Sequence, residues 1–148
     1  MRKTIGQISI VASAAVASAV LVSPMPAFAN ATVKAVLDNG ETVQFTGSDS
    51  GARKNKVKGN VTFTVRSNGN WTMDSRTSNS LIAWRNVTWT CDLLFGPAHS
   101  TIRYTIGSHR VGGGDTKNRH AGAYDADIQE FFGEIRNRGE ANCNISIG

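Results

Sequence analysis

Apolar and polar residues alternate most strictly in the segment from Val87 to Phe95. Apolar side chains take every second position there, and three of the four residues between them are polar. Successive side chains of an extended chain point to opposite faces, so the pattern predicts a central, half-buried strand. The same alternation predicts strands in three further segments: Val61 to Val65, Ile102 to Ile106 and Cys143 to Ile147.

Two short polar segments containing Asn-Gly separate apolar runs and predict hairpins. They are Asp38-Asn39-Gly40 and Ser67-Asn68-Gly69-Asn70. The Asn-Gly pair tolerates the positive φ that a tight primed turn requires. Polar or glycine-rich composition predicts surface loops in three segments, of which the last is the longest: 47–59, 76–80 and 107–122.

One amphipathic helix is predicted near the C-terminus. Four apolar residues have helical spacing: Ile128, Phe131, Phe132 and Ile135. Asp127, three residues before Glu130, resembles the start of a capping box, with Asp125 as the alternative N-cap. Gly139 is placed to end the helix. The apolar side of this helix is expected to pack across a sheet.

The first 29 residues have the features of a signal peptide. A short positive region and an apolar stretch precede Ala27-Phe28-Ala29, which has small residues at both positions that a signal peptidase reads. We therefore expect cleavage after Ala29, a secreted extracellular product, and a single β-rich domain over residues 30–148. A membrane anchor is the competing interpretation, but the apolar run is shorter than the roughly 20 residues of a spanning helix.

Cys91 and Cys143 each lie on the apolar side of a predicted strand, an orientation that suits a bridge across a core. Two cysteines in an exported chain typically form a disulfide, and two buried free thiols are the alternative. Closing a loop of about 50 residues stabilises a fold by roughly 4 kcal/mol in the chain-entropy model. With about seven strands and one late helix, the chain is predicted to be mainly β (α+β): an antiparallel β-sandwich or small barrel with one C-terminal amphipathic helix packed on it and one disulfide.

The charge of the chain is mildly basic. The formal net charge is +5, and it becomes +3 when a leader carrying Arg2 and Lys3 is removed. Such a balance suits weak attraction to anionic cell walls, membranes or nucleic acid, and it selects none of them.

The most reactive group of residues lies in the predicted loop 107–122. His109, Asp115 and His120 are the candidate catalytic residues, because paired imidazoles can act as base and acid while nearby cations hold a phosphate. The alternative is an ordinary solvated loop. His99, His109 and His120 are ten and eleven residues apart and lack the close spacing of a metal site, so no metal or other cofactor is expected.

Aromatic residues offer a second kind of candidate site. Trp71 and Trp84 stand at predicted strand ends, and an exposed indole beside Arg85 suits stacking on a sugar ring. Packing of both indoles in the core is the alternative. For Trp89 core packing is preferred, because it shares a face with Cys91.

In outline, the chain resembles small secreted actinobacterial domains of unknown function. The likeness lies in a strand-rich body, a short amphipathic helix and a Cys-bearing C-terminus, with Asn68-Gly69-Asn70-Trp71 and Trp89-Thr90-Cys91 as its local motifs. It implies the compartment and the fold class, and it transfers no activity or site residue.

The sequence favours an exported, non-enzymatic domain that binds cell-wall glycan or an extracellular protein. Glycine-rich and basic loops on a disulfide-linked sheet are a common way to build a recognition surface. We expect a monomer, with no membrane-spanning segment after cleavage. The alternative is a small secreted hydrolase or toxin that acts on nucleic acid through the segment from His109 to His120.

Overall fold

The computed structural model describes residues 31–50, 56–96 and 100–148. The expected signal peptide, its cleavage site after Ala29 and the candidate histidine His99 lie outside the described residues. Within the described ranges, no helix has the length and apolar character needed to cross a bilayer.

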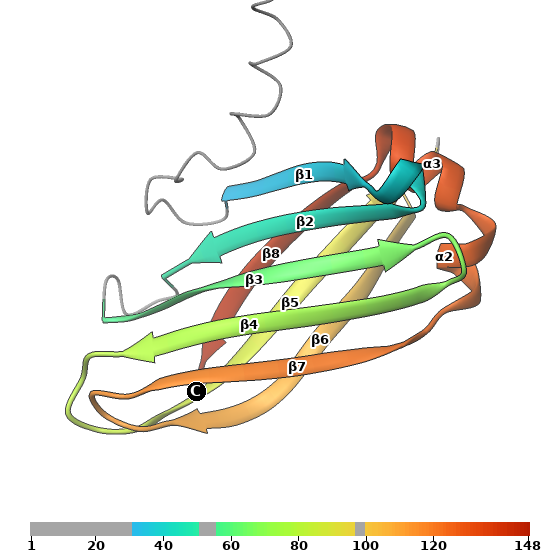
Figure 1. Ribbon diagram of the computed structural model, residues 1–148. Coiled ribbons are helices and arrows are strands. Elements are labelled where there is room, and N and C mark those ends of the chain that lie inside the picture. Colours follow the sequence, from blue (N-terminus) through green and yellow to red (C-terminus); the bar gives the residue numbers. More distant parts are fainter. Residues whose placement is uncertain (1–30, 51–55, 97–99) are drawn as a thin grey trace, which may run out of the picture.

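The fold consists of two antiparallel sheets that pack face to face, as Figure 1 shows, so the predicted β-sandwich is confirmed. The larger sheet has five strands in spatial order: β1 (Ala31–Leu37), β2 (Thr42–Asp49), β3 (Val57–Arg66), β4 (Asn70–Asn79) and β7 (Thr116–Tyr124). The smaller sheet has three: β6 (Ser100–Val111), β5 (Arg85–Phe95) and β8 (Glu140–Ile147). The inner faces of both sheets form one apolar core.

The two predicted hairpins are confirmed as β1–β2 and β3–β4. Between β1 and β2 lies a short 3₁₀ turn, η1 (Asp38–Gly40), in which Asn39 and Gly40 have φ of 61° and 88°. The prediction of a loop over 76–80 was wrong, because β4 continues to Asn79. Its last inward residues are polar but buried and hydrogen-bonded: Thr77 accepts a hydrogen bond from the Trp89 indole at 2.8 Å.

The long loop predicted over 107–122 was also wrong, because most of it forms two strands. β6 continues to Val111 and β7 begins at Thr116, so a turn of four residues joins the two sheets. A bulge opposite Thr88 shifts the register of β6 and turns His109 inward. β7 is an edge strand that pairs only with β4, and its side chains are exposed except for half-buried Ala121. A strand without a buried face has no apolar alternation for sequence analysis to detect.

The predicted amphipathic helix is two short helices, α2 (Ala126–Glu130) and α3 (Phe132–Arg138). Asp125, the alternative N-cap, begins α2 by accepting from the Asp127 N–H at 2.9 Å. Three of the four predicted core residues are buried, whereas Phe131 lies at the break and is 39% exposed. Gly133, a weak helix former, is the second residue of α3 and disfavours one continuous helix.

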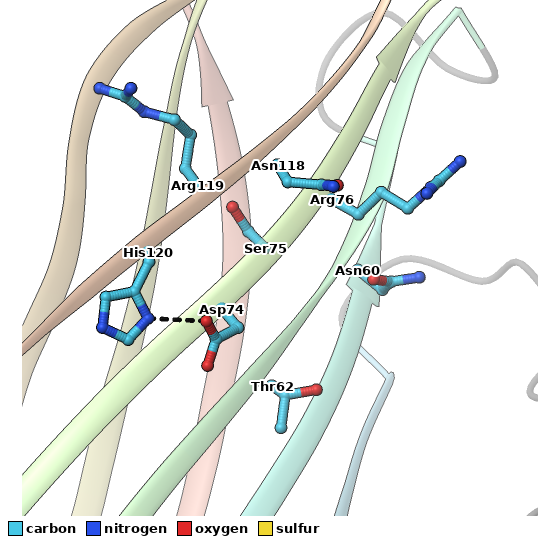
Figure 2. Close-up of a pocket in the computed structure, with 8 residues that line it drawn as sticks. All are labelled: Asn60, Thr62, Asp74, Ser75, Arg76, Asn118, Arg119 and His120. Carbon is cyan, nitrogen blue, oxygen red and sulfur yellow. Dashed lines mark hydrogen bonds and ion pairs between the residues drawn. The ribbon is translucent and has the colours of Figure 1, made fainter.

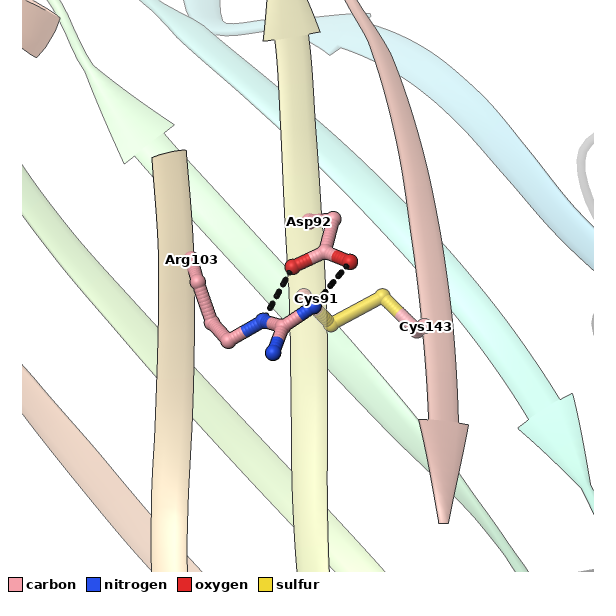
Figure 3. Close-up of polar contacts among 4 residues, drawn as sticks. All are labelled: Cys91, Asp92, Arg103 and Cys143. Atoms are coloured by element: carbon pink, nitrogen blue, oxygen red, sulfur yellow. Dashed lines mark hydrogen bonds and ion pairs between the residues drawn. A yellow bond between two sulfur atoms is a disulfide. The ribbon is translucent and has the colours of Figure 1, made fainter. Parts of the chain in front are cut away.

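The disulfide between Cys91 and Cys143 is confirmed. The two cysteines are direct partners on neighbouring strands β5 and β8, so the bond lies within the three-stranded sheet, as Figure 3 shows. The expected bridge across the core was therefore wrong in its placement. Both cysteines are fully buried, and the bond fixes the last strand of the chain to the centre of its sheet.

Candidate functional site

The outer face of the five-stranded sheet contains a shallow hollow of about 450 Å³ over β3, β4 and β7, shown in Figure 2. We call it the polar hollow, because every residue that lines it is polar or charged: Asn60, Thr62, Asp74, Ser75, Arg76, Asn118, Arg119 and His120.

Strand register brings six of these residues into two parallel rows. Each row has one residue from β3, one from β4 and one from β7: Thr62, Asp74 and His120 in the first, and Asn60, Arg76 and Asn118 in the second. All six point away from the core, because the residues that alternate with them along β4 are buried. Neighbouring strands are about 4.8 Å apart and residues i and i+2 about 7 Å, so the rows form a compact polar grid.

A hydrogen bond joins Asp74 and His120 within this grid. His120 Nδ1 lies 2.7 Å from Asp74 Oδ1, and both side chains are more than half exposed. An aspartate that accepts the Nδ1 proton fixes the neutral tautomer, in which Nε2 is the free acceptor. The exposed Nε2 can therefore accept a hydrogen bond or a proton from a bound molecule.

The other members of the grid supply hydrogen-bond donors and a positive charge. Asn60 and Asn118 each carry an amide that both donates and accepts, and Thr62 adds a hydroxyl. Arg76, beside Asn118, adds a planar guanidinium that can bind a carboxylate or phosphate through two parallel hydrogen bonds.

The structure does not bring the predicted catalytic residues together. His109 is buried on the inner side of β6, where its Nδ1 lies 3.1 Å from the Gly107 carbonyl oxygen. Asp115 lies in the turn before β7, and His120 is on the outer face of the opposite sheet. Of these three residues, only His120 lines the polar hollow.

The predicted sugar-binding residues are divided between the core and the surface. Trp71 is half-buried, and its ring centroid lies 4.9 Å from that of Tyr104. Trp84 is 48% exposed and lies next to Arg85 along a separate hollow of about 490 Å³ at one end of the sandwich. Trp84 and Arg85 therefore share a surface, and Trp71 belongs to the interior.

Most residues of the polar hollow were not predicted from the sequence as site residues. A signal was present in three pairs of polar residues at i and i+2, which face the same side of a strand: Asn60 and Thr62, Asp74 and Arg76, Asn118 and His120. The pairs become a site only when the register of three strands is known.

Comparisons with known proteins add no assignment to this geometry. No protein-family model matches the chain, and neither the curated proteins nor the solved structures searched contain a match. Among the described residues, no three His, Cys, Asp or Glu side chains gather as a metal site would require.

Proposed function

We propose that this protein is an exported domain that binds cell-wall glycan in the polar hollow. The observation that carries the proposal is the grid of six polar side chains on three adjacent strands. Sugars present closely spaced hydroxyl groups that both donate and accept hydrogen bonds. The amides of Asn60 and Asn118 match this requirement better than side chains that only donate or only accept.

The charge of the hollow favours a glycan with acidic groups. The positive charge of the hollow comes from Arg76, because Arg119 pairs with the inward-facing Ser75 and its side chain leaves β7 on the opposite side. Arg76 is able to bind a carboxylate or phosphate group of such a polymer. The Asp74 carboxylate, shared with His120, remains an acceptor for a sugar hydroxyl.

The size of the hollow favours a glycan over a protein partner. A stable protein interface buries about 800 Å² on each partner, mostly around an apolar centre. The polar hollow is small, and none of the described residues that line it is apolar. A polymer with many repeats compensates for weak binding at each site, because linked sites raise the effective concentration.

The predicted leader and the disulfide support export. A disulfide within the core of a small domain is typical of oxidising compartments outside the cytoplasm. The mildly basic charge of the chain suits weak attraction to an anionic cell-wall polymer outside the cell.

The second candidate function is hydrolysis of nucleic acid, favoured by the contact of 2.7 Å between Asp74 and His120. An aspartate-oriented histidine is a common general base, and Arg76 offers a phosphate contact. Acid–base cleavage of RNA generally uses a second proton-transfer group. Among the residues that line the hollow, His120 is the one imidazole, so binding is the better-supported function.

The test is retention of the purified protein, lacking the expected leader, on insoluble cell-wall glycan. We expect Arg76→Ala and Asn118→Ala each to weaken retention roughly tenfold, which corresponds to about 1.4 kcal/mol for a lost hydrogen bond to a charged or polar group. Arg66→Ala is the matched control, because Arg66 is an exposed arginine on the same sheet that does not line the hollow. Circular dichroism checks that each variant is folded.

Equal retention of wild type, Arg76→Ala and Arg66→Ala would overturn the glycan proposal. An RNA-cleavage assay on wild type and His120→Ala separates the second candidate. Cleavage by the wild type that His120→Ala abolishes would make the hollow a catalytic site.

A further inference from the structure

The loop between β4 and β5, residues 80–84, exposes apolar side chains at one end of the sandwich. Ile82, at its tip, is fully exposed, and Trp84 is 48% exposed. Leu81, between them and β4, packs against the core instead. We call this segment the Ile82 loop. Burial of a large aliphatic side chain that is entirely in water would gain free energy.

The backbone of the Ile82 loop is fixed by the buried side chain of Asn79. The Asn79 amide nitrogen donates to the carbonyl oxygens of Ala83 at 2.9 Å and Val111 at 3.2 Å. Its amide oxygen accepts from the Leu81 N–H at 3.0 Å. The loop is therefore a built feature of the fold, and the outward direction of Ile82 follows from these bonds.

The turn between β6 and β7 supports the same loop from the side. The Gly114 N–H donates to the Asn79 carbonyl oxygen at 2.8 Å. The Asn79 N–H donates to the Asp115 carbonyl oxygen at 2.9 Å. A side chain at Gly113 would collide with the carbonyl oxygen of Ile82. The glycine run before β7, predicted as part of a loop, thus allows the turn to approach the Ile82 loop closely.

Cationic residues adjoin the Ile82 loop, and two of them contact Trp84. The Arg110 guanidinium carbon lies 4.1 Å from the centre of the Trp84 ring, and Arg85 donates to the Trp84 carbonyl oxygen at 2.8 Å. Lys56 adjoins the loop, since its carbonyl oxygen accepts from the Ser80 N–H at 2.7 Å. Lys117 follows the supporting turn, in which Asp115 is the one acidic residue. Within the described part of this end, positive charge therefore predominates.

We propose that the Ile82 loop inserts Ile82 and Trp84 into the surface of an anionic lipid bilayer. An aliphatic side chain enters the acyl boundary, an indole prefers the headgroup level, and Lys or Arg side chains bind anionic headgroups. The Ile82 loop carries the first two elements, and Arg85 and Arg110 beside it supply the third. This inference is independent of glycan binding, because the polar hollow lies on the outer face of β3, β4 and β7 and shares no residue with the loop.

The shape of the surface favours a bilayer over a protein partner. The exposed apolar area of the Ile82 loop is confined to two side chains, and the Arg110 guanidinium stacks on one of them. A protein interface of ordinary size needs a broad complementary patch. A bilayer accommodates a single protruding side chain, and its negative surface attracts the surrounding cations over a Debye length.

The first experiment is co-sedimentation of the protein, lacking its expected leader, with vesicles. Vesicles of phosphatidylcholine alone are compared with vesicles containing phosphatidylglycerol, at low and high salt. We expect the wild type to bind the anionic vesicles at low salt and to bind them more weakly at high salt. The affinity of Ile82→Asp for these vesicles should be roughly tenfold lower. Val36→Asp, which changes another exposed aliphatic side chain on β1, is the matched control and should bind as the wild type does.

The second experiment locates the inserted side chain through tryptophan fluorescence. Brominated lipid in anionic vesicles should quench part of the emission, and Trp84→Phe should remove that quenching. Trp71 and Trp89 remain in this variant, and both pack in or against the core. Quenching that persists in Trp84→Phe would contradict insertion of this loop.

Two results would overturn the proposal. One is equal sedimentation of wild type and Ile82→Asp with anionic vesicles at low salt. The other is absence of vesicle binding together with a concentration-dependent dimer that Ile82→Asp abolishes in analytical ultracentrifugation, which would make the loop a contact between two copies of this chain. Glycan retention by Ile82→Asp should equal that of the wild type, so failure of either proposal is distinguishable from failure of the other.

Discussion

The outer faces of the two sheets both carry charged residues but use them differently. On the three-stranded sheet, Asp92 and Arg103 are direct partners on β5 and β6, joined by hydrogen bonds of 2.7 and 3.0 Å (Figure 3). On the five-stranded sheet, no hydrogen bond or ion pair joins Arg76 to another described side chain. Asp92 and Arg103 therefore use each other's hydrogen-bonding groups, whereas Arg76 keeps hydrogen-bonding capacity for a ligand.

The electrostatics of the two faces differ accordingly. The hydrogen bonds from Arg103 lower the pKa of Asp92, so this carboxylate stays charged and paired in moderately acidic solution. A paired guanidinium has fewer donors to offer a second acceptor, whereas no group in the described part of the chain uses the donors of Arg76. A charged sheet face therefore indicates a binding site only where its charged side chains are not already paired across neighbouring strands.

The largest expected effect comes from breaking the three-stranded sheet. Replacing both cysteines, Cys91→Ser with Cys143→Ser, should lower the free energy of unfolding by about 2–5 kcal/mol, because the bond constrains the unfolded chain. Urea denaturation monitored by circular dichroism measures the loss. Where the variant is still folded, glycan retention should persist, since the polar hollow belongs to the other sheet. An unchanged denaturation midpoint would contradict this contribution.

A smaller effect is expected where the three-stranded sheet meets the helices. Tyr104 on β6 is buried and donates to Asp125 at 2.7 Å. Burial and the Asp125 carboxylate both raise the pKa of Tyr104, because both disfavour the phenolate. The stabilisation is complete below the ordinary tyrosine pKa of about 10 and is lost as pH rises above that value.

Thermal unfolding between pH 7 and 11 tests this dependence. The unfolding temperature of the wild type should fall above pH 10. That of Tyr104→Phe should fall less steeply, because this variant has no phenol to ionise at position 104. Tyr124→Phe, which alters an exposed tyrosine, is the control and should follow the wild type. Parallel curves for all three proteins would show that Tyr104 does not govern the alkaline transition.

The smallest stability effect should come from the outer faces themselves. Arg103→Ala should lower the unfolding midpoint slightly, because an exposed ion pair is screened by salt, and the difference should vanish at high salt. The lowered pKa of Asp92 means that the pair stabilises the fold above about pH 4, and that this contribution is lost as pH falls.

Arg76→Ala should leave the unfolding midpoint unchanged and weaken glycan retention. A stability loss in Arg76→Ala equal to that in Arg103→Ala would remove the contrast between the two faces.

The sequence by itself determined the body of the sandwich and the identity of its disulfide. In β5, the five inward positions are apolar and buried. The alternation of side chains along a strand is a property of its own backbone, so it does not depend on which strands lie beside it. The Asn39-Gly40 turn is equally local, because few residue pairs adopt positive φ at low cost. Cys91 and Cys143 are the only cysteines in the chain, so their pairing required no knowledge of the strand order.

The tertiary structure alone decided the polar hollow, the position of β7 and the exposure of Ile82. β7 is a strand because β4 supplies its hydrogen bonds, and its own side chains carry no apolar pattern. The hollow exists because the register places Asp74 opposite His120, and register depends on three strands together. Ile82 is apolar and would be assigned to a core from sequence, yet the bonds of Asn79 turn it outward. Local patterns specify which residues can be buried, and the pairing of distant strands determines which surfaces remain available for binding.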